Sequence, residues 1–310
     1  MLKTLLLLSS LLWLSHCASQ EPAAEATQTT EKPPEATIYV LGDLHGDLTA
    51  AQQAMALTGA TNAAGEWVGQ GLTVVQTGDL IDRGPEDRAV LDWFERLAAE
   101  APKHQSVLHL LNGNHEIMNV EGDFRYIHPD SMAAFADLAD ATRSQELGIV
   151  DAPAAVQGRA NAFAPGGIYA QQLAKRPAVL ILGDTLFVHG GILPEHVSYG
   201  IEQINHDYAA HLTQGTALPK ILQPSDTSPL WTRVYSQIDQ VVDCNALQAV
   251  LTRLKLQRMV VAHTVQPHIN SACNDQVWRI DTGMSKAYQS RVEILKLQGS
   301  TAQVLTPNSP

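Results

Sequence analysis

The sequence predicts an α/β fold built on a βαβαβ unit with parallel strands, and two observations predict it. Short β-rich runs alternate with segments whose apolar residues recur at helical spacing. Three of these runs end at a Gly-Asp or Asn-Gly turn. Because ligands of open α/β sheets gather beyond the carboxyl ends of the strands, we expect these turns to meet at one site.

The first part of the chain supplies the βαβαβ unit. Apolar residues of the second predicted helix, such as Val90, Phe94 and Leu97, fall on one face. The predicted strands are 37–41, 72–77 and 107–111, and the predicted helices are 48–58 and 86–100.

The second part of the chain is richer in strands. A hairpin is expected over 179–188, with Gly183-Asp184-Thr185 at its turn. Further strands are predicted at 259–262 and near 277–281, 291–297 and 302–305. The stretch 119–175 shows a helix-like segment around 131–147 and then loop-prone sequence, so we expect a lid or insertion there.

The N-terminal residues look like a targeting segment. A cationic Lys3 precedes an apolar run over 5–14, which predicts a signal peptide at 1–19. The run is shorter than the roughly 20 residues that span a membrane. Residues 20–36 hold no aliphatic side chain beyond alanine and are expected to be a disordered linker.

This division leaves one domain over 37–300, followed by a C-terminal strand and tail at 301–310. The targeting segment predicts an exported protein, located in the periplasm or held at the outer membrane as a lipoprotein. The tetrapeptide that ends at Cys17 resembles a lipoprotein cleavage box and would make Cys17 the lipid anchor, although His16 stands where a small residue is expected. Otherwise Cys17 leaves with the signal peptide.

The other two cysteines form an even pair in a compartment that permits disulfides. We predict that Cys244 and Cys273 are joined. Two buried free thiols remain the alternative, because sequence spacing does not show whether the two Cα atoms come within reach.

The composition argues against a nucleic-acid partner. The formal net charge is −12, and no cluster of lysines and arginines stands out. If the substrate is anionic, metal cations and a few local arginines must supply the positive field.

Polar residues gather in five segments, four of which clearly follow predicted strands. Each segment alone has an ordinary interpretation, since Gly-Asp is a common turn and a lone histidine is usually structural. Their order and their shared position at strand ends favour a site. Carboxylate, imidazole and amide donors without thiolate suit Mn, Fe or Zn ions. The segments are Gly42–Asp47, Gly78–Gly84, Gly113–Glu116, Val188–Gly191 and Ala262-His263.

Together these segments resemble the calcineurin-like metallophosphoesterases, in the form of the PPP protein phosphatases. The most specific parts are Asp82-Arg83-Gly84 and Gly113–Glu116. Two more segments, 228–233 and 281–284, are similar to the bacterial Shewanella-like phosphatases. The resemblance covers about residues 37–298 and implies a metallophosphoesterase-type αββα sandwich.

The resemblance also implies two divalent or trivalent metal ions, with Asp79 bridging them. The implied ligands are Asp43, His45 and Asp79 for the first ion, and Asp79, Asn114, His189 and His263 for the second.

Four further residues carry roles in the same pattern. His115 would protonate the leaving oxygen and Asp82 would orient it. Arg83 and Arg233 would bind the phosphoryl oxygens. The motif around Arg233 departs from the eukaryotic form, so an ordinary surface arginine remains its alternative interpretation.

The expected activity is two-metal hydrolysis of phosphoesters, by in-line attack of a metal-bridging hydroxide. A phosphorylated protein or a small phosphomonoester is the expected substrate. Two alternatives stay open. One is a dinucleoside polyphosphate hydrolase or phosphodiesterase on the same core, and the other is an inactive, metal-holding binding module.

Overall fold

The structure is a computed structural model that describes residues 37–308. The predicted signal peptide, the linker and Cys17 lie outside the described residues. Among the helices of residues 37–308, none has both the length and the apolar character that a membrane crossing requires.

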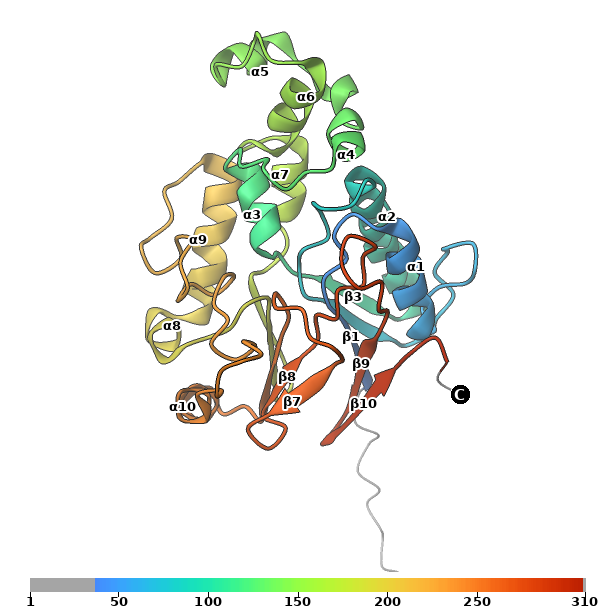
Figure 1. Ribbon diagram of the computed structural model, residues 1–310, viewed down its shortest axis with the longest axis vertical. Helices are drawn as coiled ribbons and strands as arrows, with labels where there is room; N and C mark the ends of the chain where they lie inside the picture. Colours follow the sequence, from blue (N-terminus) through green and yellow to red (C-terminus); the bar gives the residue numbers. More distant parts are fainter. Residues whose placement is uncertain (1–36, 309–310) are drawn as a thin grey trace, which may run out of the picture. The chain divides into compact units, whose positions relative to one another are not determined.

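The strands form two five-stranded sheets (Figure 1). The first has the order β10-β9-β1-β2-β3, in which β1, β2 and β3 are parallel and β9 and β10 are antiparallel to their neighbours. Its strands are β1 (Thr37–Leu41), β2 (Thr73–Gln76), β3 (Val107–Leu110), β9 (Ile294–Gln298) and β10 (Thr301–Leu305).

The second sheet has the order β4-β5-β6-β8-β7, with β5, β6 and β8 parallel. The predicted hairpin is present as the antiparallel pair β4–β5. The strands of this sheet are β4 (Val179–Leu182), β5 (Thr185–Val188), β6 (Arg258–Val261), β7 (Asn270–Ala272) and β8 (Val277–Arg279).

The two sheets pack face to face through alternate residues of their strands. Val40 and Val75 from the first sheet form one buried apolar cluster with Phe187 and Val260 from the second. Their strand neighbours, such as Leu41, belong to the other core cluster, which includes the helices. Since successive side chains of a strand point to opposite faces, each sheet is covered by helices on its outer face. The predicted αββα sandwich is therefore confirmed.

Ten α-helices surround the sheets in residues 37–308, with two 3-10 helices at Ala101–His104 and Ala136–Leu138. They are α1 (Leu48–Leu57), α2 (Asp87–Glu100), α3 (Asn114–Val120), α4 (Pro129–Ala133), α5 (Ala141–Glu146), α6 (Ala154–Phe163), α7 (Ile168–Leu173), α8 (Pro194–Tyr199), α9 (Ile201–Gln214) and α10 (Cys244–Leu254).

The single helix-like segment predicted around 131–147 is wrong. The chain leaves the helical conformation at Ala139, which is extended, and starts again when Asp140 caps α5 by accepting from the Arg143 amide. The loop-prone sequence that follows instead contains α6 and α7. Figure 1 shows α4, α5 and α6 gathered at one end of the molecule, beyond α2 and α7.

Cys244 and Cys273 are joined by a disulfide, with their Cα atoms 5.5 Å apart. The bond ties the first residue of α10 to the turn between β7 and β8. It therefore links α10 to the edge of the second sheet that β7 and β8 form.

Candidate metal and phosphate site

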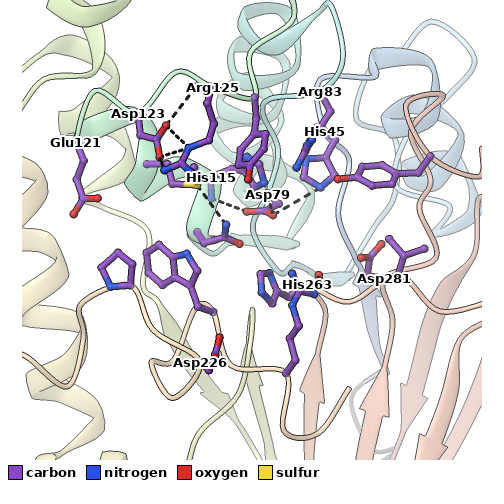
Figure 2. A pocket seen from close by; sticks show the side chains of 18 residues that line it. His45, Asp79, Arg83, His115, Glu121, Asp123, Arg125, Asp226, His263 and Asp281 are labelled. Atoms are coloured by element: carbon purple, nitrogen blue, oxygen red, sulfur yellow. Dashed lines mark hydrogen bonds and ion pairs between the residues drawn. The ribbon is translucent and has the colours of Figure 1, made fainter. Parts of the chain in front are cut away.

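Loops from both sheets meet at a cleft of about 600 Å³ (Figure 2). The loops after β1, β2 and β3 bring His45, Asp79 and His115 to its wall, and the loop after β6 brings His263. The loops of the two sheets meet here, since His189, which follows β5, lies 3.2 Å from Asp79, which follows β2. The predicted residues that line the cleft are His45, Asp79, Arg83, Asn114, His115, Arg233 and His263, and Asp43, Asp82 and His189 contact them from behind.

Unusual backbone conformations shape the loops. Five site residues that are not glycine have positive φ, a strained state that is concentrated at functional sites. They are His45, Asp79, Asp82, Arg83 and His263. Gly78 has a φ of 94°, and a Cβ at this position would lie 2.2 Å from the Gly113 amide nitrogen. Only glycine lets the loop after β2 approach the loop after β3 so closely.

One group of donors forms around His45. Its Nδ1 lies 3.1 Å from the carbonyl oxygen of Ile81 and donates to it, which leaves the Nε2 lone pair free. That Nε2 lies 3.8 Å from a carboxylate oxygen of Asp43 and 3.8 Å from one of Asp79. This geometry suits three ligands that face one cation.

A second group forms around His189, which donates from Nδ1 to the carbonyl oxygen of Thr77 at 3.1 Å. Its Nε2 then faces three further nitrogen and oxygen atoms: Asn114 Oδ1 at 3.0 Å, His263 Nδ1 at 3.1 Å and Asp79 Oδ2 at 3.2 Å. Four potential ligand atoms thus converge on one point. The donor set therefore fits a divalent metal ion.

The protonation states agree with this assignment. Burial opposes ionisation of Asp79, but His189 and His115 outweigh it and hold the pKa of Asp79 well below its usual range. Burial lowers the pKa of His45 to about 4, and burial together with His189 lowers that of His263 well below its ordinary value. Near neutral pH the carboxylate of Asp79 is charged and the imidazoles of His45 and His263 are neutral, as metal ligands must be.

Asp43 forms a carboxylate pair with Asp281, a residue to which the family pattern gave no role. Burial first, and then the charges of Asp281 and Asp79, raise the pKa of Asp43 well above its ordinary value. Burial also raises the pKa of Asp281 to about 6. Asp43 Oδ1 is buried and has no hydrogen-bond partner among the described residues, which suits a metal-ligand atom. The signal for Asp281 was its place after β8, at the same edge as the ligands.

His115 is held from behind by Asp82. Its Nδ1 lies 2.6 Å from Asp82 Oδ2, so Nε2 faces the cleft, 3.9 Å from Asp79. Burial lowers the pKa of His115, but the charges of Asp79 and Asp82 outweigh it and raise the pKa above its ordinary value. By distance alone His115 groups with His45 and Asp79 as a metal ligand. Its buried carboxylate partner equally suits a proton donor.

Two arginines line the cleft. The guanidinium of Arg83 lies 3.8 Å from the centre of the Tyr126 ring, and its buried Nε has no partner in the described part of the chain. Arg233 is exposed and donates to the carbonyl oxygen of His263 at 2.7 Å and to Thr264 at 2.9 Å. Both therefore have N–H groups available to an anion in the cleft.

Acidic residues line the outer part of the cleft. Glu121, Asp123 and Asp226 belong to its wall, and Figure 2 shows them on the side away from Asp281. Arg125 is engaged by Asp123, with Nε 2.8 Å from its Oδ1. Arg125 is thus neutralised locally and offers a phosphate less than Arg83 does.

Comparisons with known proteins identify the family. A family model described as calcineurin-like phosphoesterase matches residues 36–267. Shewanella-like protein phosphatase 2 of Arabidopsis thaliana is 33% identical over 323 residues, covering 93% of this chain and 82% of the relative. Shewanella-like protein phosphatase 1 of Plasmodium berghei is 28% identical over 258 residues, covering 80% and 67%.

A similar solved structure is that of a cold-active protein-tyrosine phosphatase from a psychrophilic Shewanella species. It superposes with a TM-score of 0.70 at 22% identity and covers 88% of this chain and 81% of that one, which supports the fold. The family match and the plant relative go further, because they show the family of the chain. The chain belongs to the calcineurin-like phosphoesterase family and is a phosphatase.

Proposed function

We propose that this chain is a phosphomonoesterase that acts on phosphorylated proteins and uses two ions of the Mn, Fe or Zn type. The observation that carries the proposal is the convergence of lone-pair donors on Asp79, beside a histidine held by a buried carboxylate. In this assignment Asp43 and His45 complete one ion site. The ligands of the other are Asn114, His189 and His263.

The side chains divide the reaction between them. When bound, the metal ions supply Lewis acidity and an activated water. Arg83 and Arg233 bind the phosphoryl oxygens and balance the charge that develops on them. His115 gives its Nε2 proton to the leaving oxygen, while Asp82 holds Nδ1 and stabilises the ring in that orientation.

The acidic outer wall supports a phosphomonoester over a polyanionic substrate. Glu121 and Asp226 would repel the extra phosphates of a dinucleoside polyphosphate, whereas the charge of Asp123 is balanced by Arg125. A phosphorylated side chain brings its charge only to the ligands and arginines, and the polypeptide around it can lie against the wall.

The direct test is hydrolysis of p-nitrophenyl phosphate with added Mn²⁺. We expect EDTA to abolish turnover and Asp79→Asn to lower it by about a hundredfold or more, because both ion sites lose a charged ligand. His115→Asn should lower hydrolysis of phenyl phosphate about a hundredfold. Asp184→Asn is a matched control, since Asp184 also follows a glycine but lies in the β4–β5 turn.

Other outcomes select the alternatives. Faster hydrolysis of bis(p-nitrophenyl) phosphate than of the monoester would make the chain a diesterase. Stoichiometric metal binding without turnover of either ester would make it a binding module.

We propose further that the protein is exported and processed at its N-terminus. The short apolar run after Lys3 supports this, as does the disulfide between Cys244 and Cys273. The mass of the mature chain from a Gram-negative host tests it. A diacylglycerol adduct on Cys17 would mean a lipoprotein, and cleavage after Cys17 a soluble periplasmic form. An intact Met1 would contradict export.

A further inference from the structure

A buried arginine of the 119–175 insertion reaches the residue that orients the proposed acid. Arg159 lies on α6, is 0% exposed, and places Nη2 3.2 Å from Asp82 Oδ1 and 2.7 Å from Asp87 Oδ2. Its Nε donates to Asn119 at 2.8 Å and its Nη1 to Ser131 at 3.1 Å. These contacts join the insertion to the loop after β2 and to α3.

The network divides the two oxygens of Asp82 between different partners. Oδ1 accepts from Arg159 and from the Asn119 amide at 3.0 Å, whereas Oδ2 accepts from His115 Nδ1. Asn119 also donates to the His115 carbonyl oxygen at 2.9 Å. Rotation of the Asp82 carboxylate would break bonds on both sides, so its orientation is fixed.

Arg159 is itself held firmly. The centre of its guanidinium lies 4.9 Å from the Phe135 ring and 5.0 Å from the Phe163 ring. It is also a cation beside two fully buried carboxylates: Asp82, which it shares with His115, and Asp87. A guanidinium with several donors in one plane suits this arrangement better than an ammonium does.

We propose that Arg159 is a positioning residue for proton donation: it fixes Asp82 so that His115 presents Nε2 to the leaving oxygen. The insertion is then part of the catalytic apparatus and is required for poor leaving groups. This inference rests on the proposed role of His115 as the acid.

The proposal makes a specific kinetic prediction. p-Nitrophenolate departs readily and needs little protonation, whereas phenolate or a serine alkoxide needs a positioned acid. Loss of positioning should therefore slow phenyl phosphate more than p-nitrophenyl phosphate. A general loss of structure would slow both equally.

The experiment compares kcat for the two substrates in Arg159→Gln and Arg159→Lys, after circular dichroism and thermal melts have verified folding. We expect the ratio of the two kcat values to change by at least about tenfold in Arg159→Gln and by less in Arg159→Lys, which retains the charge. The control is Arg143→Gln. Arg143 lies on α5 of the same insertion and donates to the Pro165 carbonyl oxygen, without contact to Asp82.

A second measurement does not require turnover. In protein loaded with diamagnetic Zn²⁺, the His115 Nδ1 proton should give a far-downfield resonance, assigned by its loss in His115→Asn. We expect that resonance to broaden or shift in Arg159→Gln and to persist in Arg143→Gln.

The outcomes separate the two proposals. An equal loss on both substrates, or an unchanged His115 resonance in Arg159→Gln, would overturn the positioning role while phosphatase activity stands. A wild-type protein that hydrolyses neither monoester would overturn the proposed function, and the resonance would still decide whether Arg159 positions the pair.

Discussion

Glu116 shows how single residues hold the site together. It is 0% exposed, and its carboxylate accepts from the amides of Asp79 at 2.9 Å, Leu80 at 2.9 Å and Gly113 at 2.7 Å. These bonds join the loop after β2 to the start of α3. Glu116, from the segment Gly113–Glu116, therefore binds the backbone of the segment Gly78–Gly84. Glu116 is therefore part of the motif because it holds the loops of the site together, and not because it contacts substrate.

The support of Arg83 by Tyr126 leads to a prediction for substrate binding. Tyr126→Ala removes the ring under the guanidinium, a contact worth about 1 kcal/mol, and should raise KM roughly fivefold. Tyr126→Phe retains the ring and should leave KM near that of the wild type. Steady-state kinetics on p-nitrophenyl phosphate measure both, and an equal rise in the two variants would contradict stacking as the cause.

At the residue scale, the sequence motifs were sufficient to predict that the proposed ligands and both arginines lie at one cleft. Asp281 was missed as a site residue because the carried-over pattern assigned it no role. Asn119 and Arg159 were missed because they act on Asp82 through contacts between distant segments. No local spacing encodes such contacts.

Among the elements, α6 shows why the helices of residues 119–175 were not predicted from the sequence. It buries Gly158, Arg159 and Asn161 together with apolar residues, so its buried face has no apolar period. A Cβ at position 158 would lie 1.9 Å from the Phe135 carbonyl oxygen, so that glycine reflects close packing and not a loop. The strands β1, β2 and β3 and the helices α1 and α2, in contrast, have regular apolar patterns, and their bounds were predicted nearly to the residue.

The start of α8 gives a prediction for pH dependence. His196 Nδ1 accepts from the Leu193 amide at 2.9 Å, which requires a neutral ring, and burial lowers the pKa of His196. The unfolded chain takes up this proton near pH 6.5 and the folded chain only at lower pH. The stabilisation is therefore complete above about pH 6.5 and is lost as the pH falls through the folded pKa.

Urea unfolding of wild type and His196→Gln at pH 7.5 and pH 5 measures this effect. The difference in free energy of unfolding between the two proteins should be smaller at pH 5. A difference that stays constant or grows with acidity would rule out His196 as the titrating group.

For the whole molecule, the site concentrates negative charge in the interior, where Asp43, Asp79 and Asp281 are each at most 2% exposed. Metal ions that bind only the folded state should stabilise it by about 2.7 kcal/mol at a hundredfold excess over Kd. We expect EDTA to lower Tm in wild type and to change it much less in Asp79→Asn. Equal shifts in scanning calorimetry would place the stabilising ion elsewhere.

The sandwich as a whole was predictable only in part. The strands β1, β2 and β3 pair in chain order, whereas the pairings of β1 with β9 and of β5 with β6 join strands that are far apart in the sequence. The opposition of Val40 to Phe187 and Val260 likewise arises from the packing of two sheets that strand patterns alone do not orient. The family resemblance supplied that part of the fold.

The place of β1 between β2 and β9 has a consequence for synthesis. Thr37 pairs with Gln298, so the ribosome has made nearly the whole domain before the first strand acquires its second neighbour. Until then one edge of β1 remains open to pairing with other chains. A nascent chain that stalls before residue 294 should therefore need a chaperone. Pairing of β9 and β10 with the sheet then completes folding.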